Sequence, residues 1–155
     1  MQILSRPTNN CPTFGIRFGG LSLAVAMIGG CSAFSPSIVA LPTGAIRVAP
    51  GPEFGAWFAQ TEACSGISGQ FQQIQWFVVP GAETFETSEG PKVGMWEKSG
   101  SVARIIIAGR YLGHEMVVRH EMLHHILDRE GHPQEFFADR CHLTWQTWPN
   151  ATADH

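Results

Sequence analysis

The chain has 155 residues and a formal net charge of −3 at pH 7, with ten Lys and Arg against thirteen Asp and Glu. Two of the basic residues, Arg6 and Arg17, lie in the first 30 positions, which leaves eight basic residues against thirteen acidic ones and a net charge of −5. This length suits one domain with one hydrophobic core. The acidic balance gives no support to nucleic-acid binding, and we expect no nucleic-acid partner.

Residues 1–30 have the features of a lipoprotein signal peptide. Positive charge precedes the apolar run Leu21–Ile28, which is too short to span a membrane. The junction Ile28-Gly-Gly-Cys31 resembles the lipobox of bacterial lipoproteins, in which the cysteine is diacylated and becomes the mature N-terminus. The resemblance implies a membrane anchor on Cys31, in the bacterial cell envelope facing the periplasm, and Ser32 fits sorting to the outer membrane. An ordinary secretory signal, cleaved a few residues later, is the alternative.

The next segment, residues 31–52, contains four prolines and is expected to form a tether. Hydrophobic periodicity then indicates alternating short strands and helices. The predicted elements are a short strand at 46–49, a helix at 53–64, a strand at 71–79, a polar loop at 83–91, and two strands at 93–98 and 102–108 that form a hairpin.

The segment Val117–Asp128 contains the pattern His-Glu-x-x-His at His120, Glu121 and His124. On a helix with 3.6 residues per turn, positions 120 and 124 lie one above the other, about 6 Å apart along the axis, so two imidazoles can bind one metal ion. Glu121 lies about 100° round the helix, where its carboxylate can take a proton from a water on the metal without being a ligand. Apolar residues flank this face on both sides, which favours a helix packed between two layers.

This segment resembles the active-site helix of the zincin metallopeptidases, because Val118, Met122 and Ile126 supply the uncharged residues that the extended zincin pattern requires. The resemblance implies a Zn2+ cofactor, a peptide or protein substrate, and Glu121 as the general base of a zinc-assisted hydrolysis. It also implies a small α+β fold, in which a short mixed or antiparallel sheet precedes the active-site helix and a C-terminal helix follows it. We therefore expect residues 53–155 to form a zincin-like metallopeptidase domain.

A zinc peptidase needs a third protein ligand and leaves the fourth position to water. We expect the chain to turn at Gly131, in a left-handed conformation after the helix, just before a further helix begins. This places His132 at a sharp corner beside the metal and resembles the metzincin and SprT-like zincins, although the spacing from His124 is longer than in metzincins. The alternative third ligand is Glu135, which with Asp139 resembles the pattern of the gluzincins.

Two cysteines, Cys64 and Cys141, remain beyond the predicted signal peptide and lipidation site. A pair of cysteines in an exported protein suggests a disulfide, which here links the first helix of the domain to the helix after the metal site. Two buried thiols are the alternative.

Zincins bind the substrate as an added β-strand along the edge strand before the active-site helix, and Val102–Ala108 is our candidate for that neighbourhood. Its apolar run is equally typical of a covered central strand. Many zincins also use a Tyr or His to stabilise the oxyanion that forms during hydrolysis. Tyr111 and His142 are candidates for that role, and the sequence favours neither.

Three functions are consistent with these features. The first is a membrane-tethered zinc metallopeptidase. The second is a non-catalytic zinc-binding or envelope-assembly lipoprotein on the same scaffold, and the third is a structural lipoprotein without a metal. The presence of Glu121 favours the enzyme, and the sequence makes no prediction of cleavage specificity or oligomeric state.

Overall fold

The computed structural model describes residues 40–149. The predicted signal peptide and the predicted lipidation site at Cys31 lie outside the described residues. Within this range the chain forms a mixed four-stranded sheet, a two-stranded hairpin and several helices, so the α+β prediction is confirmed.

The four-stranded sheet has the order β1-β2-β6-β5. Strand β2 pairs in parallel with β6, whereas β1 pairs antiparallel with β2, and β5 antiparallel with β6. This places β6 in the interior of the sheet and β5 at its edge. The bounds are Ile46–Val48 for β1, Ile74–Val79 for β2, Gly94–Ser99 for β5 and Val102–Ala108 for β6.

The apolar run of β6 is therefore that of a covered central strand, and Val102–Ala108 is not the edge strand. Its side chains alternate between the two faces of the sheet. Ile105 and Ile107 belong to the main core beneath the helices, and Ile106 belongs to a smaller cluster on the opposite face. Burial on both faces explains why a continuous apolar sequence is stable here.

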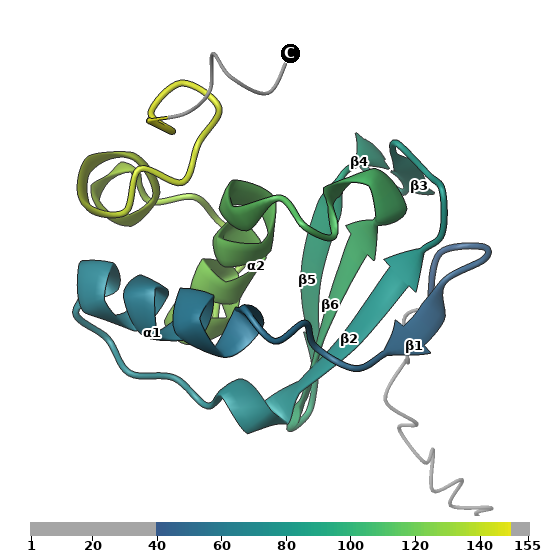
Figure 1. Cartoon of the computed structure of the whole chain (residues 1–155), viewed down its shortest axis with the longest axis horizontal. Helices are drawn as coiled ribbons and strands as arrows, with labels where there is room; N and C mark the ends of the chain where they lie inside the picture. The colour runs from purple at the N-terminus through teal and green to yellow at the C-terminus, as the bar shows by residue number, and fades with distance from the viewer. Residues whose placement is uncertain (1–39, 150–155) are drawn as a thin grey trace, which may run out of the picture. The chain divides into compact units, whose positions relative to one another are not determined.

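The helices cover one face of the sheet (Figure 1). Helix α2 packs against α1 and against β5 and β6, and η3 contacts α1. Apolar residues on both sides of α2 are buried, as expected for a helix between two layers. The bounds are Phe54–Ser65 for α1, Glu115–Leu127 for α2 and Glu135–Arg140 for the π-helix η3, with short 3-10 turns η1 at Phe71–Gln73 and η2 at Gly109–Tyr111.

The structure differs from the sequence prediction at three places. The predicted polar loop at 83–91 contains a second hairpin, in which β3 (Phe85–Thr87) pairs with β4 (Gly90–Lys92). Helix α2 ends at Leu127 rather than near Gly131, because Asp128 takes the left-handed conformation with φ 50°. The strand β1 joins the sheet, so the part of the predicted tether from Ile46 onwards is paired with the domain.

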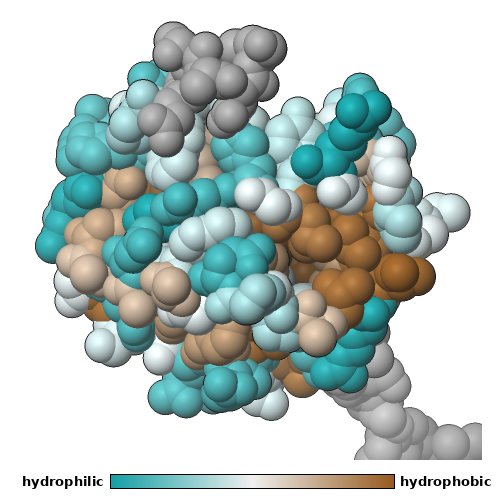
Figure 2. Space-filling model, viewed as in Figure 1, coloured by the Kyte–Doolittle hydropathy of each residue, from teal (hydrophilic) through white to brown (hydrophobic). Residues whose placement is uncertain are grey.

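The sheet face away from the helices carries its own small apolar cluster. Phe77, Phe85, Ile106 and Ala108 are buried there. In the same view as Figure 1, hydrophobic atoms gather on the strand side of the molecule (Figure 2). None of the helices among residues 40–149 is long and apolar enough to cross a membrane.

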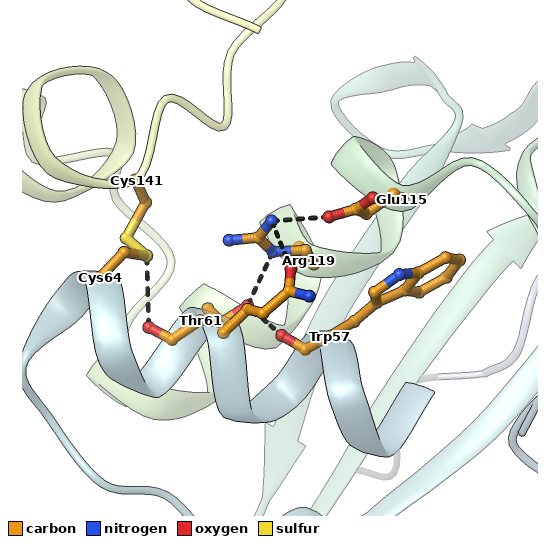
Figure 3. A network of polar contacts seen from close by, with 7 residues as sticks. Trp57, Thr61, Cys64, Glu115, Arg119 and Cys141 are labelled. Atoms are coloured by element: carbon orange, nitrogen blue, oxygen red, sulfur yellow. Dashed lines mark hydrogen bonds and ion pairs between the residues drawn. A yellow bond between two sulfur atoms is a disulfide. The ribbon is translucent and has the colours of Figure 1, made fainter. Parts of the chain in front are cut away.

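A buried arginine joins the two main helices (Figure 3). From α2, the guanidinium of Arg119 donates to the hydroxyl of Thr61 at 3.2 Å and to the amide oxygen of Gln60 at 3.1 Å, both on α1. It also forms an ion pair with Glu115 one turn earlier, at 2.7 Å. Buried polar groups need such partners, so this network fixes how α2 lies on α1.

Candidate metal centre

Three histidine side chains meet at one point in the structure. His120 and His124 lie one turn apart on α2, and His132 comes from the turn between α2 and η3. The Nε2 atom of His132 lies 3.0 Å from Nε2 of His120 and 3.1 Å from Nε2 of His124. Ligand atoms from all three residues lie within 4.8 Å of one another, so the group can hold a metal ion.

Two of these rings are oriented by main-chain carbonyl groups. Nδ1 of His120 lies 2.7 Å from the carbonyl oxygen of Leu143, and Nδ1 of His124 lies 2.9 Å from that of Arg129. A carbonyl only accepts, so each Nδ1 must carry the hydrogen and donate it. The Nε2 atoms of His120 and His124 then present lone pairs, as in metal sites where the second ring nitrogen is bound to a carbonyl.

The close approach of the three Nε2 atoms fits a bound cation. A neutral His132 can donate from Nε2 to at most one of the other two rings, so at least one Nε2 lone pair lies about 3 Å from another ring nitrogen with no hydrogen between them. A metal ion bound by all three nitrogens removes this repulsion. Ligands at 2.0–2.1 Å in a tetrahedral site are separated by about 3.3 Å, close to the spacing found here.

The left-handed turn at Asp128 creates one of these contacts. The N–H of Asp128 donates to the carbonyl of His125, and the N–H of Arg129 donates to the carbonyl of His124, both at 3.3 Å. This closes the helix early and folds residue 129 back over its last turn. The Arg129 carbonyl thereby reaches the His124 ring, and the chain continues towards His132.

One phenylalanine ring packs against all three histidine rings. The ring of Phe137, on η3, lies with its centroid 4.7 Å from that of His120, 4.8 Å from His124 and 4.9 Å from His132. Trp96 of β5 stacks on His124 with an interplanar angle of 11°. These rings give two sides of the site an apolar lining.

Burial keeps the histidines neutral. It lowers the pKa of His120 to about 4, against a raising effect of the bond to Leu143. It lowers the pKa of His124 to about 3, against the bond to Arg129. The pKa of the more exposed His132 is also lowered, first by burial and then by the charge of Lys92. Metal ligation requires the neutral imidazole, so the environment favours the ligating form at neutral pH.

Glu121 is buried between α2 and the edge strand β5. A Cβ placed on Gly94 would lie 2.7 Å from a carboxylate oxygen of Glu121, so the glycine leaves room for this side chain in its present position. Burial raises the pKa of Glu121 to about 8, opposed by the charge of Lys92 and by a hydrogen bond from the main chain of Trp96. A buried carboxylate of this kind is a stronger base than an exposed one.

Two cavities open on either side of Glu121. One, of about 720 Å³, runs along β5 and past all three histidines to the turn before His132. The other, of about 380 Å³, lies over the first turns of α2 and is partly apolar, with Met116, Val117 and Trp145 in its wall. Glu121 thus lines both the larger cleft along β5 and the smaller pocket over α2.

The structure separates the predicted site residues into two groups. His132 lies with His120 and His124, whereas the alternative ligand Glu135 lies outside this group and faces Arg140 at 3.6 Å. Asp139, on the same π-helix, lies 3.5 Å from Nε2 of Gln134.

The two candidate oxyanion residues do not reach the site. Tyr111 packs against His114 and Trp145, and His142 takes a left-handed conformation with φ 54°. Neither residue lines either of the two cavities beside Glu121.

The predicted disulfide between Cys64 and Cys141 is confirmed (Figure 3). It ties the end of η3 to α1, two residues before Leu143. The carbonyl of Leu143 orients His120, and its N–H donates to the carbonyl of Phe137 at 2.7 Å. The disulfide therefore fixes the segment from Phe137 to Leu143, which contacts the histidines.

Sequence reasoning missed two residues of the site, Gly94 and Lys92. Gly94 begins β5 and supplies the space for Glu121, and Lys92 ends β4 and lines both cavities. Both follow the segment 83–91 that was expected to be a polar loop. A glycine between a loop and a strand is an ordinary feature, so no local pattern marks either residue.

No family model, no curated protein and no solved structure matches this chain.

Proposed function

We propose that this protein is a zinc-dependent peptidase with a zincin-like site, in which His120, His124 and His132 are the metal ligands and Glu121 is the general base. One observation carries the proposal. A buried carboxylate that is not a ligand stands beside three converging neutral imidazoles, at the junction of a strand-edged cleft and a pocket. Three nitrogen ligands with a fourth position left open are typical of catalytic zinc rather than structural zinc.

The chemistry divides between the metal and Glu121. When bound, a zinc ion would polarise the scissile carbonyl and lower the pKa of a water molecule towards about 7. The charge of the bound metal would favour the ionised form of Glu121. In that form Glu121 takes a proton from the attacking water, whose oxygen bonds to the carbonyl carbon while the carbonyl π electrons move onto oxygen. When the carbonyl re-forms, the C–N bond breaks and Glu121 passes its proton to the departing amine.

The edge strand supports a peptide as the substrate. Among residues 40–149, β5 pairs only with β6, and its other edge borders the larger cleft. An extended peptide can add to such an edge through main-chain hydrogen bonds, which bind any sequence, while pockets select side chains. We therefore propose Gly94–Ser99 as the substrate-binding strand, rather than the Val102–Ala108 neighbourhood indicated by the sequence.

The proposal includes a place in the bacterial envelope, with Cys31 lipidated and the domain facing the periplasm, at the outer membrane. The signal-like residues 1–30 support export. The Cys64–Cys141 disulfide supports an oxidising compartment. Mass spectrometry of the purified chain should detect acyl groups on Cys31, and Cys31→Ser should release the protein from the membrane fraction.

The activity is tested on the purified chain after zinc loading. We expect one zinc per chain, cleavage of some members of a mixed peptide library, and a fall of about 10²–10⁴-fold in kcat for Glu121→Gln with zinc retained. Zinc content and folding of Glu121→Gln serve as the control for the integrity of the site. His132→Ala and Glu135→Ala compare the two candidate third ligands, and only the first should reduce zinc affinity.

The results separate the enzyme from the other candidates. Zinc bound by the three histidines without any Glu121-dependent cleavage would identify a non-catalytic zinc-binding protein. Absence of zinc after reconstitution would leave a structural protein.

A further inference from the structure

Four residues line both cavities beside the histidines, and one of them is a lysine. These four are Lys92, Gly94, His120 and Glu121. Of the four, Lys92 is the residue whose side chain ends in an ammonium group. Lys92 therefore stands where the two cavities meet, next to the proposed base and one of the proposed ligands.

The position of Lys92 follows from the β3–β4 hairpin. Lys92 is the last residue of β4 and pairs with Phe85, whose side chain is buried in the smaller apolar cluster. Two residues later the chain enters β5 at Gly94, against Glu121. The lysine is thus held between an anchored strand and the wall of the site.

The positive charge of Lys92 affects the pKa of three ionisable side chains of the site. It opposes the burial that raises the pKa of Glu121, and it adds to the burial that lowers the pKa of His124 and His132. This electrostatic reach agrees with the shared cavity lining.

The present partner of Lys92 is easily replaced. Its ammonium pairs with Glu89, and the two side chains are 32% and 70% exposed. Exposed ion pairs contribute little free energy. An anion at the junction of the cavities can therefore exchange with Glu89.

We propose that Lys92 is an anion-binding residue of this site, whose ammonium group binds a negatively charged oxygen of the substrate beside the three histidines. The inference rests on the proposed peptidase function and adds to it a group that Tyr111 and His142 do not supply. The oxygen has two possible sources with the same chemistry. It is either the carbonyl oxygen that becomes negative during hydrolysis or a free carboxylate of the peptide, and a charged hydrogen bond stabilises both.

Anion binding to the metal-loaded chain tests the inference without peptide cleavage. The probes are acetate and inorganic phosphate, titrated into the full chain loaded with cobalt and followed by its visible absorption. Loss of one charge-assisted hydrogen bond should weaken binding about tenfold to a hundredfold in Lys92→Met. Glu89→Gln should tighten binding about twofold to fivefold, because the competing carboxylate is removed.

Lys98→Met is the matched control. Lys98 is 34% exposed, pairs with Asp128 at 2.6 Å and lines the larger cleft, so it loses the same charge in a similar setting. It does not line the smaller cavity. We expect it to change anion affinity by less than twofold, with metal content equal in all variants.

Peptide kinetics then distinguish the two sources of the oxygen. If Lys92 stabilises the developing charge, Lys92→Met lowers kcat equally for peptides with free and amidated C-termini. If it binds a substrate carboxylate, KM rises for the free peptide alone. Anion affinity of Lys92→Met no weaker than that of Lys98→Met, or no anion binding by the parent, would overturn the inference. Weakened anion binding without any peptidase activity would uphold it and reject the proposed function.

Discussion

The two walls of the site are built in different ways. The helical wall is formed by α2 and η3, and its histidines are held by buried contacts. Main-chain carbonyls orient two of the rings, and the ring of Phe137 packs against all three. The strand wall, formed by β4 and β5, presents Lys92, whose partner is the exposed Glu89. A metal needs fixed ligands, whereas a substrate needs groups that can change partner. The difference suits the two walls to these tasks.

The largest effect is expected when one metal ligand of the helical wall is removed. His124→Ala should abolish zinc binding, because two remaining imidazoles form an incomplete site, and binding by a complete structural site is worth about 10–16 kcal/mol. His125→Ala is the matched control. His125 is the next residue on α2 and is also buried, but its Nε2 lies 3.2 Å from the carbonyl of Gln70 rather than in the site. Zinc titration should show retention in the control, and loss in both would contradict the assignment.

Removal of the Cys64–Cys141 disulfide should destabilise the helical wall without changing any of the proposed ligands. The double variant Cys64→Ser with Cys141→Ser opens a loop with a sequence separation of 77, which should cost about 4 kcal/mol of unfolding free energy in the chain-entropy model. Zinc affinity should fall too, since Leu143 loses its anchor beside His120. Denaturant unfolding and zinc titration measure the two effects. Unchanged zinc affinity in a folded variant would show that η3 is positioned without the bridge.

Acid should weaken the metal-free helical wall through its two most strongly shifted histidines. Burial lowers the pKa of His120 to about 4 and of His124 to about 3, against an ordinary value of 6.5. Well above pH 6.5 the two histidines are neutral in both states and add no pH dependence. Glu121, whose pKa is raised to about 8 by burial, instead keeps a proton only in the folded chain, so its contribution to stability falls as the pH rises towards 8. Below pH 6.5 the histidines of the unfolded chain take up protons that the folded chain refuses, so stability falls until about pH 4.

The two histidines together account for a loss of about 3 kcal/mol at pH 5.5, and the proton that only the folded chain holds on Glu121 offsets part of it. Denaturant unfolding of the metal-free chain between pH 7.5 and 5 measures the slope. The double variant His120→Asn with His124→Asn should remove this loss, so that stability no longer falls as the pH is lowered. An equal slope in the variant would assign the pH dependence to other groups.

The smallest effect concerns the strand wall at Gly94. Gly94→Ala places a Cβ 2.7 Å from the Glu121 carboxylate, so the Glu121 side chain or the packing of β5 on α2 must shift, at a cost of about 1–3 kcal/mol. Activity should fall further than stability because the base is displaced. Gly55→Ala, in α1 with open space around its Cβ, should instead stabilise by about 0.5–1 kcal/mol. A well-folded, fully active Gly94→Ala chain would show that this contact is not required.

Short-range sequence patterns predicted two features of the helical wall correctly. The spacing of His120 and His124 sets their common face, and the pairing of Cys64 with Cys141 followed from counting cysteines. The place of the helix end was predicted less well, because Asp128 rather than Gly131 takes the left-handed conformation. Asp tolerates that conformation at a local cost, and the turn it makes is favoured here by the contacts of Arg129 and His132.

The strand wall was not predictable from local pattern. Segment 83–91 is polar because its hairpin lies at the surface, so it has no clear periodicity. Whether β5 or β6 forms the edge depends on which strand pairs with β2, and that pairing joins segments distant in the chain. Gly94 and Lys92 became part of the site only through this order of strands.

Short-range sequence patterns were sufficient to predict the His-Glu-x-x-His helix, the nearby His132 and the cysteine pair, because helical geometry and disulfide chemistry depend on spacing and on residue counts. The packing of distant elements was needed to show that His132 rather than Glu135 joins the pair, that main-chain carbonyls orient two of the rings, and that Lys92 and Gly94 lie beside Glu121. These contacts join residues from separate elements, and their formation depends on how the sheet, α2 and η3 pack together.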